Sequence, residues 1–169
     1  MWALTVDTNA IRDYAEPHRE GHKIAKELIE LHDAGTCQIR VTTRFDSDVP
    51  GGPLRSKLEA LPVLDNPQIG TVFRLDVSRL DSGDMIASEE WAKEADELMA
   101  LLFPGATSES GRHRNRMADV DHLMGHKIAG RDIFVTNEKA ILNQREALSA
   151  KFGITVMSPG EAVEKVSPP

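Results

Sequence analysis

The segment from Asp121 to Glu138, DHLMGHKIAGRDIFVTNE, decides the fold that this sequence predicts. Its first half has the apolar spacing of a helix, Gly130 marks a turn, and residues 133–136 are a short buried strand. A second helix then opens on Glu138. A helix, a strand and a helix joined by short turns are typical of a parallel α/β sheet.

The rest of the chain continues this alternation of strands and helices. Predicted strands are 4–6, 38–43 and 154–157, and predicted helices are 17–34, 54–61, 88–103, 139–152 and one that starts at Ser158 with a capping box. Residues 69–77 are an extended segment without an assigned place in the sheet, and 107–115 are a polar loop. We therefore predict a single domain, residues 1–169, folded as a three-layer α/β/α sandwich with a central, mainly parallel sheet.

The composition is that of an ordinary globular chain, with 169 residues, 40% of them hydrophobic, and a net charge of −7. The single cysteine, Cys37, excludes an intrachain disulfide and a thiolate metal cage. No apolar run is as long as a membrane span, and the first residues suit a strand better than a signal peptide, so we expect a cytoplasmic protein with no membrane partner. The acidic balance disfavours broad nucleic-acid binding, whereas a local basic cluster can still contact phosphates. That cluster is Arg112, Arg114 and Arg116.

Three acids occupy positions that need a partner or a ligand. Asp7 and Glu138 each follow a predicted strand directly, and ligand sites of parallel sheets form at this end of the strands. Asp121 falls on the apolar face of its helix, where an acid is costly unless a cation or a hydrogen-bond network compensates it. Asp119 points elsewhere, so we assign it to a helix cap or to the surface. The sequence therefore predicts a cation site made by Asp7, Asp121 and Glu138.

These motifs resemble the PIN-domain ribonuclease family. The resemblance is carried by Val6-Asp7-Thr8-Asn9, by Asp121 and by Val135-Thr136-Asn137-Glu138, and it extends poorly to residues 50–111. It implies a PIN-like fold and a metal-dependent endoribonuclease that uses Mg²⁺ or Mn²⁺. The implied catalytic and metal-binding residues are Asp7, Asp121 and Glu138, supported by Asn9 and Thr136. Glu138 stands where the family usually has aspartate, which keeps the charge on a longer side chain.

The resemblance also implies a fourth metal-binding carboxylate after the second strand. Spacing favours Asp48, with Asp46 and Glu59 as alternatives. His122 and His126 have the i, i+4 spacing of metal-binding histidines on a helix, but no third nitrogen or sulfur ligand accompanies them. They also lie off the phase of Asp121, and we interpret them as a surface or packing pair.

The function that the resemblance implies is hydrolysis of RNA. If the protein is a toxin-type nuclease, the resemblance also implies an antitoxin as its protein partner. A homodimer is compatible with this function. Two alternatives are a catalytically weak PIN-like module that binds RNA or protein, and a metal-dependent phosphohydrolase of a small phosphate ester. If the nuclease reading holds, exchange of Asp7 or Asp121 for asparagine abolishes RNA cleavage, whereas Asp119→Asn retains most activity.

Overall fold

Parallel strands form the centre of the fold. A computed structural model describes residues 1–49, 51–72, 84–107 and 112–168. The strands within these ranges are β1 (Trp2–Val6), β2 (Cys37–Arg40), β3 (Ile133–Val135) and β4 (Val156–Met157). They lie in the order β2-β1-β3-β4, and each pairing is parallel. The predicted parallel sheet is therefore confirmed.

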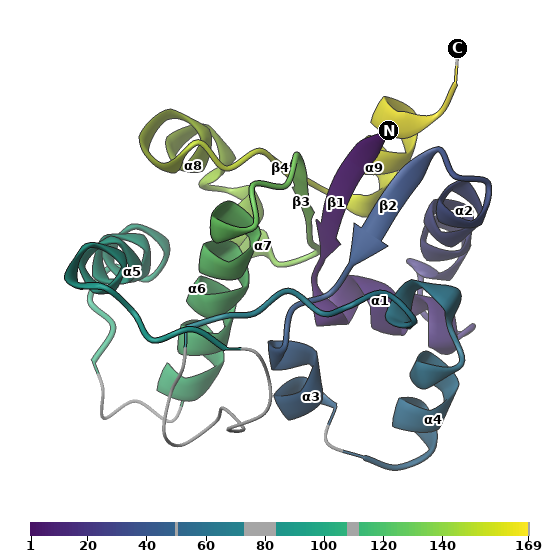
Figure 1. Cartoon of the computed structure of the whole chain (residues 1–169), viewed down its shortest axis with the longest axis horizontal. Coiled ribbons are helices and arrows are strands. Elements are labelled where there is room, and N and C mark those ends of the chain that lie inside the picture. The colour runs from purple at the N-terminus through teal and green to yellow at the C-terminus, as the bar shows by residue number, and fades with distance from the viewer. Residues whose placement is uncertain (50, 73–83, 108–111, 169) are drawn as a thin grey trace.

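Helices cover both faces of this sheet (Figure 1). One layer contains α1 (Thr8–Ala15), α2 (His22–Asp33) and α9 (Pro159–Val166), and the other contains α5 (Glu89–Leu102), α6 (His113–Ile128), α7 (Lys139–Leu142) and α8 (Arg145–Phe152). The short helices α3 (Arg44–Asp48) and α4 (Pro53–Glu59) and the single turn η1 (Pro62–Leu64) follow β2. The three-layer α/β/α arrangement is thus confirmed. Within the described ranges, no helix is long and apolar enough to cross a membrane.

The two layers follow from the alternation of side chains along the strands. Leu4 and Val6 of β1 belong to one apolar cluster, together with Leu28 of α2. Phe134 of β3 belongs to a second cluster, formed with α5, α6 and α8. Because β2 and β3 flank β1 on opposite sides, the carboxyl ends of β1 and β3 form the switch point of the sheet. Ligand sites of open parallel sheets form at this point.

Several element boundaries follow from local sequence signals. The Ser88 side chain accepts a hydrogen bond from the Trp91 backbone and starts α5. Ser158 and Glu161 form the complete capping box of α9. Gly153 ends α8 with a φ of 68°, a left-handed conformation that favours glycine. These predictions are confirmed.

The predicted helix 17–34 is wrong in its first turns. Helix α1 ends at Ala15, before the predicted start at residue 17. Helix α2 begins only at His22, after a turn that contains Gly21. Pro17 disfavours a helical conformation in the residue before it, which ends α1. Asp13 of α1 is buried and packs so closely on Gly21 that a Cβ at this position would collide with the Asp13 carboxylate. The turn between α1 and α2 thus packs closely on Asp13, and Gly21 leaves room for the Asp13 carboxylate.

Other predicted boundaries are also wrong. The helix predicted at 139–152 divides into α7 and α8, and the strand predicted at 38–43 ends at Arg40. Helix α6 already begins within the predicted polar loop 107–115. In the segment predicted to be extended, Ile69 and Val72 make isolated parallel bridges. Residues 73–77 and 108–111 lie outside the described residues.

His126 of α6 is buried between the helix and the sheet. Its side chain lies in the core, with Nδ1 2.9 Å from Thr5 Oγ1 and its ring edge-on to Phe134. Burial, and then the charge of Arg131, lower the pKa of His126 from 6.5 to about 4. The folded protein therefore keeps this imidazole neutral at pH values where the unfolded chain protonates it.

We expect the His126 contribution to stability to be complete above pH 6.5 and to be lost as the pH falls to about 4. The unfolded state binds the proton first, so each step toward acid favours unfolding. The free energy of unfolding should fall by about 3 kcal/mol through this group. Urea denaturation of the wild type and of His126→Leu across this pH range isolates the effect, because other titrating groups are common to both. An identical pH dependence in the two proteins would contradict this prediction.

Candidate functional site

A cleft of about 660 Å³ opens at the carboxyl ends of β1 and β3. Its walls come from the turns after these strands, from α1 and α3, and from the first half of α6. The acids that line it are Asp7, Asp48, Asp119, Asp121 and Glu138. The cleft therefore gathers carboxylates from segments that are far apart in the sequence.

Thr136 connects the two acids at the strand ends. The Asp7 backbone N–H donates to Val135 O at 2.9 Å, which continues the pairing of β1 and β3. The Thr136 hydroxyl donates to Asp7 Oδ2 at 2.8 Å and accepts from the Glu138 backbone N–H at 2.9 Å. Asn9 lines the same cleft from α1. The structure thus brings together Asp7 and Asn9, which follow β1, with Thr136 and Glu138, which follow β3.

Asp48, at the end of α3, is held by two donors on the same carboxylate oxygen. Thr8 Oγ1 donates to Asp48 Oδ2 at 2.8 Å, and His122 Nε2 lies 3.1 Å from that oxygen. Burial alone would raise the pKa of Asp48, but the contacts with His122 and Thr8 and the charge of Arg44 outweigh it and lower the pKa. Asp48 is therefore an ionised acid of the cleft.

The two alternatives to Asp48 bind elsewhere. Asp46 Oδ1 lies 2.6 Å from Arg55 Nη2, and Glu59 Oε1 lies 2.7 Å from Arg55 Nε. Neither Asp46 nor Glu59 lines the cleft. Of these three acids, only Asp48 faces Asp7 and Glu138 across the cleft.

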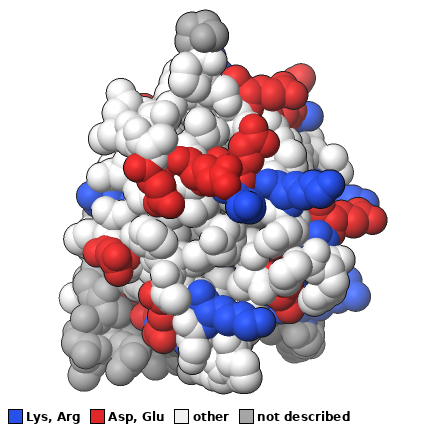
Figure 2. All heavy atoms as spheres, turned by 90° about the vertical axis from the view of Figure 1, so that its right-hand side faces the viewer, with Lys and Arg blue, Asp and Glu red and all other residues white. Residues whose placement is uncertain are grey.

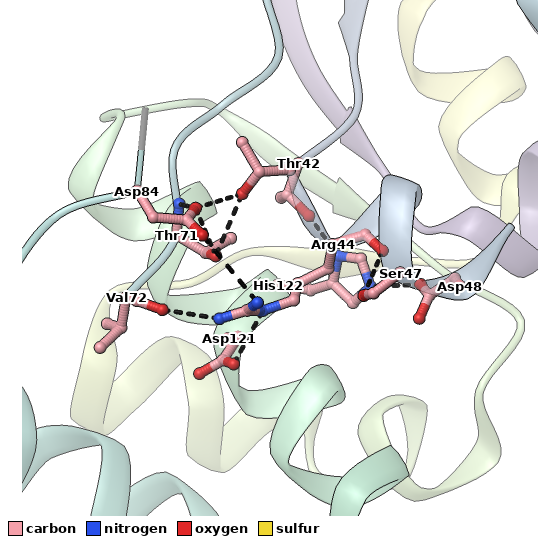
Figure 3. Close-up of polar contacts among 10 residues, drawn as sticks. Thr42, Arg44, Ser47, Asp48, Thr71, Val72, Asp84, Asp121 and His122 are labelled. Atoms are coloured by element: carbon pink, nitrogen blue, oxygen red, sulfur yellow. Dashed lines mark hydrogen bonds and ion pairs between the residues drawn. The ribbon is translucent and has the colours of Figure 1, made fainter. Parts of the chain in front are cut away.

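Asp121 is compensated by an arginine. Its side chain is buried, and its Oδ2 accepts from Arg44 Nε at 2.9 Å (Figure 3). Arg44 is buried as well, and its Nη2 donates to Val72 O at 2.6 Å. Asp84 Oδ2 lies 3.9 Å from Arg44 Nη1. Asp121 is therefore buried, as its place on the apolar face of the helix predicted. The cation that compensates its charge is the Arg44 guanidinium.

Asp119 lies among the other acids of the cleft. Burial, together with the charges of Asp7, Glu138 and Asp48 and partly offset by His122, raises the pKa of Asp119 to about 7. The expectation that Asp119 caps the helix or lies on its surface is wrong, because α6 begins at His113 and the Asp119 side chain lines the cleft. Both acids of α6 thus line the cleft, but Asp121 is paired with a buried arginine, whereas Asp119 lies among other acids.

His122 is a site residue that our sequence interpretation missed. It is buried, lines the cleft and contacts both Asp48 and Thr42. Burial alone would lower the pKa of His122, but the contact with Asp48 and the charges of Asp7 and Asp119 raise it. The available signal was its i, i+3 spacing from Asp119, which places both side chains on one helix face.

Only part of the predicted basic cluster lies at the cleft. Arg114 lines it, whereas Arg112 and Arg116 do not. The Arg116 guanidinium instead stands 5.4 Å from the centre of the Phe103 ring. Arg12 of α1 and His113 of α6 also line the cleft. Sequence reasoning missed Arg12 because it did not predict α1.

The side of the molecule on which α2 and α4 lie has mixed charges (Figure 2). Acidic side chains gather near the middle of this face, and the basic ones are scattered among them. A phosphate backbone is repelled by such an acidic area. Among its described residues, this face therefore offers no continuous basic surface to a phosphate backbone.

The donors of the cleft do not form a ready-made metal cage. Among the residues that the structure describes, no three histidine, cysteine, aspartate or glutamate side chains stand close enough to ligate a single ion. The carboxylates instead surround the cleft, near enough for three of them to raise the pKa of Asp119. The negative charges of these three neighbours therefore disfavour ionisation of Asp119.

Comparison with known proteins does not identify a relative. No protein-family model matches the sequence, and no curated protein is significantly similar to it. Function must therefore be inferred from the cleft itself.

Proposed function

We propose that the protein is a PIN-like, metal-dependent endoribonuclease whose cleft holds Mg²⁺ or Mn²⁺. The observation that carries this proposal is the convergence of carboxylates from distant segments at the switch point of a parallel sheet. The proposed metal-binding residues are Asp7, Asp48, Asp119 and Glu138. Asp119 takes the place of Asp121 in this set, because Asp121 is paired with the buried Arg44.

The donor set suits these ions. Mg²⁺ and Mn²⁺ prefer oxygen ligands, and carboxylates are the donors that surround the cleft. Cys37 is buried in an apolar cluster, where burial raises its pKa to about 11, so it is not a thiolate ligand. When bound, the cation supplies Lewis-acid chemistry that activates water and stabilises negative charge on a phosphate. Because no three described side chains surround one point, binding requires these carboxylates to adjust.

The remaining residues of the cleft support phosphate binding and orientation. Thr136 holds one oxygen of Asp7, and Glu138 follows it in the same turn. Arg12, His113 and Arg114 supply the basic flank. A flank of this kind lets a chain with a net charge of −7 accept an RNA backbone locally. Thr8 and His122 hold Asp48 on the opposite wall.

RNA cleavage set beside ester hydrolysis tests the proposal. We expect Mn²⁺-dependent internal cleavage of an unstructured RNA oligonucleotide, no cleavage in EDTA, and no hydrolysis of a small aryl phosphate ester. Asp7→Asn should abolish cleavage, and Asp96→Asn, an exposed acid of α5, should retain it. Ester hydrolysis without RNA cleavage would instead indicate a phosphohydrolase. RNA binding without cleavage would indicate a binding module.

A further inference from the structure

Both ring nitrogens of His122 contact protein atoms. Nδ1 lies 2.6 Å from Thr42 Oγ1, and Nε2 lies 3.1 Å from Asp48 Oδ2 (Figure 3). The residue is 3% exposed. An imidazole in this position has no nitrogen left for a metal ion or a substrate. Any effect on the chemistry of the cleft must therefore pass through Asp48.

Asp48 needs such a support. It is the last residue of α3, a helix of 5 residues, and so short a helix has little stability of its own. Thr8 of α1 and His122 of α6 contact the same oxygen, Oδ2, from two different elements. Among the described residues, the hydrogen bonds of the Asp48 carboxylate are made by Oδ2 and not by Oδ1. The two contacts thus leave Oδ1 as the oxygen available to a cation.

The position of His122 also relates Asp48 to Asp119. His122 and Asp119 share one face of α6, so the helix that supplies one carboxylate of the cleft also fixes another. Thr42 is itself held in place, because it forms a parallel bridge with Ile69. The contacts of His122 with Thr42 and Asp48 therefore connect α6 to α3. Thr42, whose backbone pairs with Ile69, holds the imidazole in place.

We propose that His122 is a positioning residue that orients Asp48 for metal binding, with Thr42 setting the orientation of the imidazole. This inference rests on the proposed function, because it assigns a role within the same metal site. Groups that orient a metal ligand in this way typically change metal affinity when they are removed.

His126 provides a matched control one helical turn away. It is also a buried histidine of α6 with Nδ1 near a threonine hydroxyl, that of Thr5. It packs on Phe134 and does not line the cleft. His122→Leu and His126→Leu therefore make the same chemical change in the same helix, with and without the contact to Asp48.

The experiment measures the dissociation constant of Mn²⁺ from the free-ion electron paramagnetic resonance signal, without RNA, and the Mn²⁺ dependence of cleavage. His122→Leu should weaken Mn²⁺ binding roughly 10- to 100-fold, with the KM for RNA unchanged and kcat partly restored at saturating Mn²⁺. His122→Gln places an amide N–H near the position of Nε2 and should recover most of the affinity. His126→Leu should bind Mn²⁺ as the wild type does. Adding His122→Leu to Asp48→Asn should produce little further loss.

Specific outcomes separate this inference from the proposed function. If the wild type binds Mn²⁺ and cleaves RNA while His122→Leu has unchanged affinity, the positioning role is overturned and the function stands. Equal weakening in His126→Leu would also overturn it, because both variants would then only loosen α6. A wild type that does not bind Mn²⁺ overturns both. If His122→Leu does not fold, Thr42→Val removes the other contact of the imidazole and should weaken Mn²⁺ binding in the same direction; unchanged affinity in that variant would overturn the inference.

Discussion

Asp119→Asn is expected to lower kcat/KM for RNA cleavage by about a thousandfold, which corresponds to about 4 kcal/mol of activation free energy. The reason is that Asp119 faces Asp7, Glu138 and Asp48, whose charges raise its pKa together with burial. Measurement of initial rates at several Mn²⁺ concentrations tests this, with Asp96→Asn as the control for loss of a helical acid. A variant that keeps more than about a tenth of the wild-type activity would remove Asp119 from the mechanism.

The same variant should be more stable than the wild type when no metal is present. The pKa of Asp119 is raised from 3.8 to about 7, so the folded state holds a proton that the unfolded state has already released. The favourable contribution of the protonated acid is complete at low pH and is lost as the pH rises through about 7. At pH 8 in EDTA, Asp119→Asn should gain about 2 kcal/mol, after allowance for partial exposure of the side chain.

Thermal and urea unfolding at pH 8 and pH 5 check this second effect, and the gain should be larger at pH 8. Loss of activity combined with a gain in stability would separate a functional role from misfolding. A variant that is less stable than the wild type at pH 8 would show that Asp119 is not under repulsion from its neighbours.

Asp121→Ala, in contrast to Asp119→Asn, is expected to destabilise the protein. It should lower the free energy of unfolding by about 3 kcal/mol. The change leaves the buried Arg44 guanidinium without the carboxylate that contacts Nε at 2.9 Å. Asp84, 3.9 Å from Nη1, still contributes, which keeps the loss at the lower end for broken buried ion pairs. Asp121→Asn retains an acceptor for Arg44 Nε and should lose less.

Urea denaturation followed by tryptophan fluorescence measures this loss. The exposed Asp96→Ala in α5 is the control and should change stability by less than about 0.5 kcal/mol. A loss below about 1 kcal/mol in Asp121→Ala would mean that Arg44 finds full compensation elsewhere. It would also reopen the assignment of Asp121 to the metal site.

The sequence alone predicted the fold class and four of the acids that line the cleft, Asp7, Asp48, Asp121 and Glu138. Hydrophobic runs and capping signals are read locally, so the strands and the capping box at Ser158 could be located before any packing was known. The carboxyl ends of parallel strands meet at one edge, so Asp7 and Glu138 could be placed near each other. Boundaries that depend on tertiary contact, such as the break before α2 at Gly21, could not be found in this way.

Both acids of α6 line the cleft, and tertiary structure decided which of them is paired with a cation. Helical phase correctly indicated that Asp119 and Asp121 point in different directions, but burial has more than one cause. The charge of Asp121 is compensated by a cation of the protein, whereas Asp119 lies in a cleft with other acids. Arg44, separated from Asp121 by 77 positions in the chain, distinguishes the two cases, and no local pattern indicates that contact.

The same reason explains why the sequence pattern treated His122 and His126 as equivalent. Their i, i+4 spacing is a property of the helix, whereas their partners depend on how α6 packs against the sheet and α3. That packing places His126 against Phe134 and Thr5, and His122 against Asp48. Hydrogen bonds and close charge pairs act over a few ångströms. Local sequence therefore determined which elements form, and the docking of α6 on the sheet and α3 decided which of its polar side chains meet.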